Sequence, residues 1–301
     1  MINLTLKHFR YFDALARHGH FGRAAEACSI SQPALSVQIK ELEAMLGAPL
    51  VERSARKIRL TTLGEEFLER AQKVLADVEA MGDLARLSEG PLKGRLRMGI
   101  IPTVAPYLLP AIIRGLSEEL PDLELRPREA VTQSLLDDLR HSRLDFIVAA
   151  LPVSEPAFRE FALFDEEFVL VRAGQDAHKP VPSPSKLQEM KLLLLEEGHC
   201  FRDQALEFCE IKQSDPSLLM EGSSLSTLVQ MVDAGLGLTL IPEMAITLEQ
   251  RGTSVSLSRF ESAPPKRTIG MVWRRTNPLQ KQLLDLGSML RRIGQERQDR
   301  L

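Results

Sequence analysis

The 301-residue sequence has no stretch that approaches the roughly 20 consecutive apolar residues of a membrane-spanning helix. Its first residues, MINLTLKHFRYF, lack the charged-then-apolar layout of a secretory signal peptide. Its three cysteines are too few for the disulfide framework of a secreted protein. We therefore expect a cytoplasmic globular protein without membrane contact, and the length suits about two or three compact units.

Positive charge is concentrated at the N-terminal end of the chain. Residues 1–62 contain nine Lys and Arg side chains against five Asp and Glu, a net charge of +4. Because the whole chain carries −3, the remainder carries −7. This charge distribution indicates that residues 1–62 form a module that binds nucleic acid phosphates. The acidic remainder of the chain would form a module that does not.

The first 60 residues predict three short helices. Apolar residues recur at three- and four-residue steps over 4–15, and residues 21–28 form a second helix. The third helix is expected to begin after Ser31 as its N-cap, with Pro33 in the first turn, and to end at Gly47. A tight turn followed by short side chains at the start of the next helix is typical of a helix-turn-helix.

The third helix and the segment after it carry the candidate DNA contacts. The Gln32 amide could bond adenine bidentately, and Ser31 and Ser36 could reach phosphates or bases. The following run VERSARKIRLT predicts a short basic hairpin. Its Arg53, Arg56 and Lys57 would serve as a wing against the DNA backbone or minor groove. The fold expected for residues 1–60 is thus a winged helix-turn-helix.

A long helix is expected next, capped by Thr61 or Thr62 and running to about Leu87. We predict that its apolar stripe meets the same stripe of a second subunit in a homodimer; packing on the chain's own sensor domain remains an alternative. Residues 61–90 thus form a linker and dimerisation helix, and EGPLKG at 89–94 is the connection. The stripe has nearly heptad spacing and comprises Leu63, Phe67, Ala71, Val74, Val78 and Met81.

Residues 91–301 alternate between strand-like and helix-like segments. This alternation predicts an α/β domain with parallel sheets and right-handed crossovers. The length suits two lobes, as in periplasmic binding proteins. Lobe I would comprise about 93–163 and 268–301, and lobe II about 164–267. Lobes of this kind bind ligands beyond the carboxyl ends of their strands.

One continuous run in the N-terminal part identifies a family. FGRAAEACSISQPALSVQIKELEAMLGAPLVERSARKIRLTTLGEEFL, from Phe21, strongly resembles the DNA-binding head of LysR-type transcriptional regulators without a gap. The resemblance implies double-stranded promoter DNA as a partner, with RNA polymerase as a further one. The candidate DNA-binding residues are Ser31, Gln32, Pro33, Ser36, Arg53, Arg56 and Lys57.

The three cysteines need separate explanations. Cys28 falls on the inward stripe of its helix and is interpreted as a small buried hydrophobe. Cys200 and Cys209, with His199 beside them, do not match common zinc or iron–sulfur spacings, so we expect no metal and no cofactor. Cys200 should lie near a helix N-terminus, where backbone amides favour a thiolate. Both could equally be inert core cysteines.

The spacing of Cys200 and Cys209 matters for any bond between them. If residues 201–211 form one helix, a rise of about 1.5 Å per residue puts their α-carbons on the order of 13 Å apart. A disulfide requires about 4.4 to 6.8 Å. The two thiols can therefore join only if the helix unwinds or moves, which would couple oxidation to a change of shape.

The run GHCFRDQALEFC, from Gly198 to Cys209, resembles the signature of a peroxide-sensing branch of the LysR-type family. The likeness covers nearly the whole chain. It implies that Cys200 is the thiol oxidised by hydrogen peroxide, that Cys209 resolves it into a disulfide, and that dimers pair into a homotetramer. The segment EIKQSDPS after Cys209 departs from the branch's pattern, which puts the speed and reversibility of the switch in doubt. The candidate peroxide-binding residues are Thr103, Thr132, His199, Arg267 and Asp203.

Three other functions stay open on the sequence. A LysR-type regulator could respond to a small organic effector between the lobes, with the cysteines incidental. A thiol peroxidase could oxidise and reduce Cys200 and Cys209 in a catalytic cycle. The DNA-binding head argues against this, and we expect that the protein is not an enzyme. The two expected lobes would also fit a periplasmic solute-binding protein. The sequence starts without the expected signal peptide and contains a helix-turn-helix, and both features argue against that class.

Overall fold

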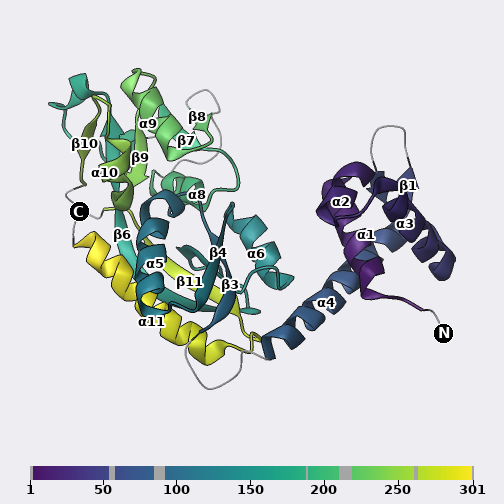
Figure 1. Ribbon diagram of the computed structural model, residues 1–301. Coiled ribbons are helices and arrows are strands. Elements are labelled where there is room, and N and C mark those ends of the chain that lie inside the picture. The colour runs from purple at the N-terminus through teal and green to yellow at the C-terminus, as the bar shows by residue number, and fades with distance from the viewer. Residues whose placement is uncertain are drawn as a thin grey trace. The chain divides into compact units, whose positions relative to one another are not determined.

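The computed structural model describes residues 3–53, 58–84, 92–187, 189–209, 219–260 and 264–299. The chain divides into two units, residues 1–85 and 86–301, each with its own elements (Figure 1). Among the described residues, no helix is both long and apolar enough to cross a membrane.

The first unit is a three-helix head with a two-stranded wing, as predicted. Ser31 caps the third helix by accepting a hydrogen bond from the Ala34 amide at 3.3 Å, and Gly47 ends it in the left-handed region at φ 72°. The apolar faces of the helices form a separate core around Phe12, Leu35 and Ile39. The elements are α1 (Leu6–His18), α2 (Phe21–Ala27), α3 (Gln32–Leu46), β1 (Val51–Arg53), β2 (Ile58–Leu60) and α4 (Thr62–Leu84).

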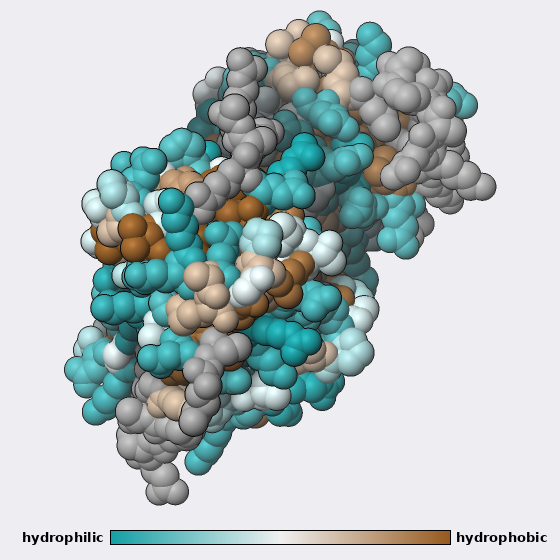
Figure 2. Space-filling view, turned by 90° about the vertical axis from the view of Figure 1, so that its right-hand side faces the viewer, coloured by the Kyte–Doolittle hydropathy of each residue, from teal (hydrophilic) through white to brown (hydrophobic). Residues whose placement is uncertain are grey.

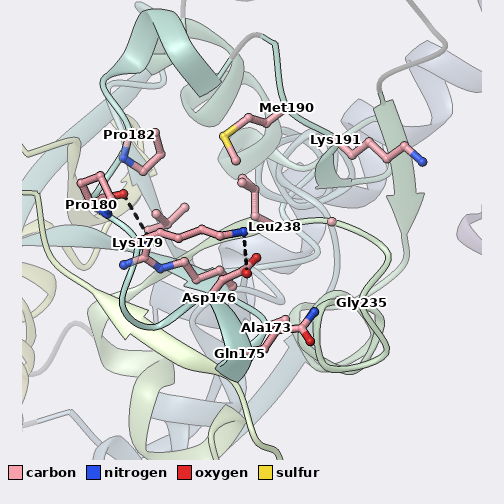
Figure 3. Close-up of a pocket in the computed structure, with 13 residues that line it drawn as sticks. Ala173, Gln175, Asp176, Lys179, Pro180, Pro182, Met190, Lys191, Gly235 and Leu238 are labelled. Atoms are coloured by element: carbon pink, nitrogen blue, oxygen red, sulfur yellow. Dashed lines mark hydrogen bonds and ion pairs between the residues drawn. The ribbon is translucent and has the colours of Figure 1, made fainter.

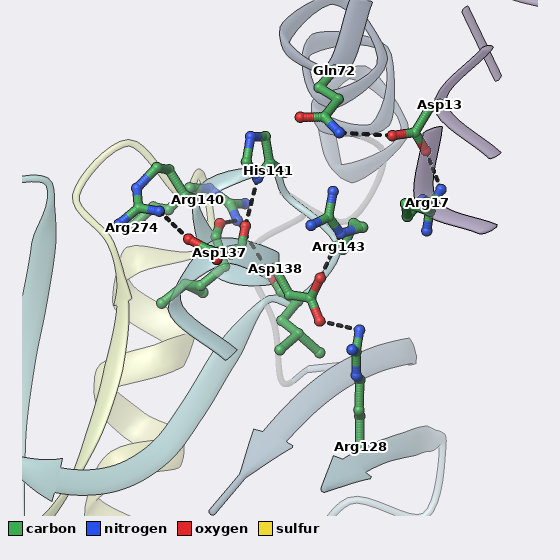
Figure 4. Close-up of polar contacts among 12 residues, drawn as sticks. Asp13, Arg17, Gln72, Arg128, Asp137, Asp138, Arg140, His141, Arg143 and Arg274 are labelled. Carbon is green, nitrogen blue, oxygen red and sulfur yellow. Dashed lines mark hydrogen bonds and ion pairs between the residues drawn. The ribbon is translucent and has the colours of Figure 1, made fainter. Parts of the chain in front are cut away.

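The long helix α4 is anchored to the head at its start. Thr61 caps it by accepting from the Gly64 amide at 3.0 Å. A Cβ on Gly64 would lie 2.1 Å from the Leu50 carbonyl oxygen, so only glycine lets the helix begin this close to the wing. The buried Asp13 carboxylate of α1 accepts a 2.8 Å hydrogen bond from Gln72 of α4 (Figure 4).

Two residues assigned to the dimer stripe face the head instead. The Phe67 ring packs on Phe9 and Phe12 with centroid separations of 5.8 and 5.5 Å, and Ala71 is buried. The prediction that Ala71 meets a second subunit is therefore wrong, and Phe67 gives most of its contacts to the head. The physical reason is that the first turns of α4 cover the apolar face of α1, which heptad spacing alone does not reveal.

Other positions of the stripe remain uncovered in the single chain. Leu63 and Val74 are exposed, Val74 by 38%, and Met81 by 67%. The surface in Figure 2 is largely hydrophilic with separate hydrophobic patches, and several exposed apolar side chains on one face of a helix are typical of a contact site. They support the prediction that α4 contacts a second subunit.

Replacing Val74 by glutamate is therefore expected to shift the protein from dimer towards monomer, because a charge would have to be buried at the helix contact. Sedimentation at micromolar concentration measures the change. Lys73→Glu alters the charge at the neighbouring, exposed position and serves as a matched control. A Val74→Glu protein with an unchanged dimer mass would contradict the assignment.

The second unit is an α/β domain built around a curled mixed sheet. Its strand order is β10-β6-β11-β5-β3-β4, with β9 also paired to β6, and β7 and β8 form a separate parallel pair. The strands are β3 (Gly94–Ile100), β4 (Leu123–Glu129), β5 (Phe146–Leu151), β6 (Phe158–Arg172), β7 (Leu192–Leu195), β8 (Leu219–Gly222), β9 (Thr239–Pro242), β10 (Ser256–Ser258) and β11 (Lys266–Arg274).

The prediction of parallel sheets is correct for only part of the sheet. Strands β3, β4 and β5 are parallel, but β11 returns from far along the chain and inserts antiparallel between β5 and β6. Strands β9 and β10 also pair antiparallel with β6. An alternation of elements does not specify strand direction, because direction depends on partners distant in sequence.

The helices of the second unit pack on these strands. Near α6, the buried Asp138 carboxylate pairs with Arg128 of β4 and, at 2.5 Å, with Arg143 beyond the helix, so two side chains converge on it (Figure 4). This network fixes the strand and helix that precede β5. The helices are α5 (Ala105–Glu119), α6 (Thr132–Arg140), α7 (Pro184–Leu187), α8 (Cys200–Phe208), α9 (Leu225–Asp233), α10 (Ile246–Glu249) and α11 (Gln280–Gln298).

Candidate functional site

The exposed face of α3 begins with the residues predicted to contact DNA. Ser31, Gln32 and Pro33 are exposed and Ser36 is half-buried, whereas Leu35 and the other stripe residues point into the core. The Ser31 oxygen is used by the helix cap, but its hydroxyl hydrogen can still be donated. The helix thus presents short polar side chains at its N-terminal end, as base-edge contacts require.

The Glu43 carboxylate of α3 helps to hold the wing in place. Oε1 of Glu43 accepts hydrogen bonds from the Leu50 and Val51 amides at 2.9 and 3.2 Å, which fixes where β1 starts relative to the helix. Arg53 ends β1, while its side chain, Arg56 and Lys57 lie outside the described residues. Their DNA contacts stay predictions.

The two thiols of the second unit lie at opposite ends of α8. Cys200 is the first residue of the helix, half-buried, and Cys209 is its C-cap, fully buried; both are free thiols. Nine residues of helical rise, about 1.5 Å each, give a separation on the order of 13 Å. The predicted geometry is therefore present, with Cys200 at the helix N-terminus.

Burial sets the protonation of two groups on this helix. Desolvation raises the pKa of the Cys209 thiol to about 12, so it is protonated at neutral pH. Desolvation also lowers the pKa of His199, the N-cap of α8, against a smaller opposite effect of Glu196. The lowered pKa favours neutral His199 at neutral pH, in which one ring nitrogen is an acceptor and the other a donor.

A buried polar cluster lies under the first turn of α8. Arg267, at the start of β11, donates from Nε to Glu166 Oε1 at 2.7 Å and from Nη1 to Thr103 Oγ1 at 2.8 Å. Its guanidinium carbon lies 5.3 Å from the centre of the Phe201 ring, next to Cys200 in sequence. Two of the predicted peroxide-binding residues, Thr103 and Arg267, thus contact each other directly.

The first turn of α6 reaches the same neighbourhood. A Cβ built on Gly198 would lie 3.8 Å from the Val131 side chain, so the loop before His199 lies against the residue that precedes Thr132. The Thr132 hydroxyl is buried and has no hydrogen-bond partner in the described part of the chain. An unpaired buried hydroxyl costs about 1 to 3 kcal/mol, which favours a polar guest beside it.

Asp203 differs from the other candidates because it is exposed, in the first turn of α8. An acidic side chain there interacts favourably with the helix dipole. Arg202, by contrast, is buried, and its Nη1 donates to the Leu195 carbonyl oxygen at 2.8 Å and to Glu221 at 2.6 Å. It anchors α8 to β7 and β8.

Sequence reasoning missed three members of this site. Glu166 compensates the charge of Arg267, and an acid inside the apolar strand FALFDEEFVLV was the available signal. Phe201 packs between Arg267 and Phe168. Gln204, one turn after Cys200, has a buried Oε1 without a partner in the described part of the chain, and its place in the run GHCFRDQALEFC was the available signal.

Cys28 lies in the head, away from α8 in sequence and in a different unit. It is the C-cap of α2, half-buried, and packs against the core of the head, so the predicted burial is partial. Burial raises the pKa of its thiol above the ordinary value. These properties suit a structural residue.

Comparisons with known proteins agree with both units. Residues 6–65 match the family model of the bacterial regulatory helix-turn-helix protein, lysR family, and residues 89–294 match the LysR substrate binding domain.

Individual relatives extend over nearly the whole chain. A probable hydrogen peroxide-inducible genes activator of Streptomyces viridosporus is 43% identical over 90% of this chain and 88% of its own. The DNA-binding transcriptional dual regulator OxyR of Escherichia coli K12 is 39% identical over 96% of this chain and 95% of its own. The hydrogen peroxide-bound structure of a Corynebacterium glutamicum OxyR mutant covers 98% of this chain and 94% of its own, with 38% identity and a TM-score of 0.66. The chain therefore belongs to the LysR family of bacterial helix-turn-helix transcriptional regulators.

Proposed function

We propose that this regulator senses hydrogen peroxide through reversible oxidation of Cys200 and a disulfide with Cys209, and thereby controls oxidative-stress genes. The observation that carries the proposal is the pair of free thiols at the two ends of α8, with Cys200 next in sequence to Phe201, whose ring packs on the buried Arg267. The names of the relatives point the same way.

The oxidation of the two thiols takes two steps. The Cys200 thiolate attacks one oxygen of hydrogen peroxide, the O–O bond breaks, and hydroxide leaves with the bonding electrons, so Cys200 becomes a sulfenic acid. Cys209 loses its proton and attacks that sulfur as a thiolate, and the oxygen leaves as hydroxide, which takes up that proton to form water. The pair is oxidised by two electrons, and one peroxide is reduced.

Thr103, Thr132, His199 and Arg267 are proposed to hold the peroxide. Thr103 accepts from Arg267, which leaves its own hydroxyl hydrogen free to point at an oxygen of the peroxide. The buried, unpartnered Thr132 hydroxyl and Gln204 carbonyl oxygen supply further groups that a peroxide would satisfy. Asp203 is placed only at the edge of this set, because it is exposed.

The same geometry prevents premature bonding. A thiol with a pKa of about 12 is a poor nucleophile at neutral pH, and a separation on the order of 13 Å exceeds the span of a disulfide. Cys209 must leave its buried position to react, and exposure would return its pKa towards the ordinary value. Unwinding of α8 therefore limits the second step.

Hydrogen exchange before and after peroxide tests this mechanism. In reduced protein the amides of residues 201–209 are expected to be protected by the helix, and in disulfide-bonded protein they should exchange at least about tenfold faster, because the helix has opened. Mass mapping of the Cys200–Cys209 bridge runs alongside. Cys209→Ser should form sulfenic acid at Cys200 and keep the helix protected. Equal exchange in the two redox states would rule out the opening of α8.

The DNA contacts are tested by substitution on α3. Gln32→Ala is expected to cost about 1 to 3 kcal/mol against the preferred operator and little against unrelated DNA, because a base-edge contact is lost. Gln38→Ala is the matched control, since that amide donates to Glu41 at 2.6 Å on the same helix. Binding titrations on both DNAs measure the difference. An unchanged operator preference in Gln32→Ala would remove this residue from the interface.

The larger assembly follows from the same proposal. We place the DNA-binding domain at residues 1–60, the dimerisation helix at 61–90 and the redox-sensing domain at 91–301, with lobe I at about 93–163 and 268–301. A homodimer through α4, paired into a tetramer, would set the spacing of the heads on DNA. RNA polymerase is the proposed partner at promoters, and the cytoplasm is the compartment because the chromosome lies there.

A further inference from the structure

The described part of the second unit contains a cavity of about 380 Å³ that none of the residues discussed above explains. It lies at the C-terminal end of β6, between the connection that follows this strand and the turn after α9 (Figure 3). None of its lining residues belongs to the cluster around Cys200. Its size falls in the usual range of small-molecule sites, about 300 to 1,000 Å³.

The walls of the cavity are largely apolar. Leu170, Leu238 and Pro182 line it, and the Met190 side chain extends between Pro182 and Leu238 (Figure 3). Met190 is exposed although it is large and apolar. Such walls suit the hydrocarbon or aromatic part of a small ligand.

One buried cation lies in this wall. Arg172 is only 7% exposed, and its guanidinium donates from Nη1 to the Pro180 carbonyl oxygen at 3.1 Å and from Nη2 to Ser258 Oγ at 2.9 Å. Its Nε is buried and has no hydrogen-bond partner in the described part of the chain. No ion pair of Arg172 with a carboxylate occurs among the described residues. A buried charge without a counter-charge is unfavourable.

Two of the other three charges at the cavity cancel. Lys179 pairs with Asp176 at 2.6 Å (Figure 3). Lys191 carries its ammonium group away from the other lining side chains (Figure 3). The cavity is therefore left with one excess positive charge, that of Arg172, which one carboxylate would balance.

We propose that this cavity is a second ligand site, which binds a small monocarboxylate with an apolar body. The carboxylate pairs side-on with the Arg172 guanidinium, through Nε and one Nη, and the apolar body lies against Leu170, Leu238 and Met190. Because Nε is shielded from solvent in the empty cavity, binding includes a rotation of the guanidinium. The site is independent of the thiols, so the reduced protein binds the ligand.

Calorimetry on the full-length reduced protein tests this, with benzoate as the probe and benzamide as its uncharged match. Benzoate is expected to bind with one equivalent per chain, and benzamide at least about tenfold more weakly, because a charge-assisted pair is lost. Arg172→Gln should lower benzoate affinity about tenfold or more. Lys191→Gln removes a charge that points away and should stay within about twofold of the unsubstituted protein.

A second variant covers the case in which Arg172→Gln does not fold. Ala173→Leu fills the cavity from its wall and leaves the guanidinium in place, so it should also lower benzoate affinity about tenfold. Equal affinities for benzoate and benzamide would overturn the role of Arg172. Benzoate binding that survives Ala173→Leu unchanged would place the ligand elsewhere, and no binding at millimolar benzoate would overturn the site. None of these outcomes depends on peroxide sensing.

Discussion

Replacing Cys200 by serine is expected to reduce the transcriptional response to hydrogen peroxide to background while the reduced protein binds its operator with unchanged affinity. A serine hydroxyl does not form a sulfenic acid, so the first oxidation step is lost. Cys209 cannot substitute for it, because burial holds the pKa of that thiol at about 12. The DNA-binding residues are in the other unit and should be unaffected. A reporter assay with and without peroxide, together with operator titrations, measures both effects.

Cys28→Ser is the matched control for this experiment. That thiol is half-buried in the head and its pKa is raised by burial, so the substitution should preserve the response. If the Cys200→Ser protein still responds fully to peroxide, the cysteines are incidental. The alternative of a regulator that answers to an organic effector between its lobes would then be favoured.

Replacing Arg267 by methionine is expected to lower the free energy of unfolding by about 3 to 5 kcal/mol. The Arg267 and Glu166 side chains are 0% and 1% exposed, and the substitution leaves the Glu166 carboxylate buried without its counter-charge. Burial already raises the pKa of Glu166, and Arg267 opposes that rise. The Thr103 hydroxyl also loses its donor. Urea denaturation of the reduced protein measures the loss.

Two further variants separate the ion pair from general damage. Arg267→Met combined with Glu166→Gln should recover part of the stability, because no charge then remains buried. Arg259→Met removes the partner of Glu243 in an ion pair where the arginine is mostly exposed, and it should cost at most about 1 kcal/mol. If Arg267→Met and Arg259→Met lower the free energy of unfolding equally, the buried ion pair stabilises the protein no more than the exposed one.

The parts of the structure that depend on neighbouring residues could be predicted from the sequence. The third helix begins after Ser31 and ends before Gly47 as expected, because capping chemistry lies within a few residues of each end. The position of Cys200 at the start of α8 follows from the same kind of local signal. Family resemblance supplied Thr103 and Arg267, which the structure brings into direct contact.

The parts that depend on distant partners could not be predicted in this way. Glu166 and Arg267 are separated by 101 residues, and no local pattern pairs them. Phe67 fits a heptad stripe equally well whether it meets a second subunit or the head's own Phe12. The direction of β11 likewise depends on β5 and β6, which lie over 90 residues earlier in the chain.

The length of β6 limits how the second unit can transmit a signal. This one strand pairs with β11 over residues 158–167 and with β9 over residues 168–171. It therefore joins the part of the sheet that contains β11 to the part that contains β9. Its ladder with β11 is interrupted by an irregularity beside Ile269 and Gly270, where a strand bends most easily. At other positions along β6, a rotation of the β11 part of the sheet relative to the β9 part would break hydrogen bonds between the strands. The β6–β11 ladder is therefore expected to bend most easily beside Ile269 and Gly270, and a change at α8 is expected to twist the sheet there.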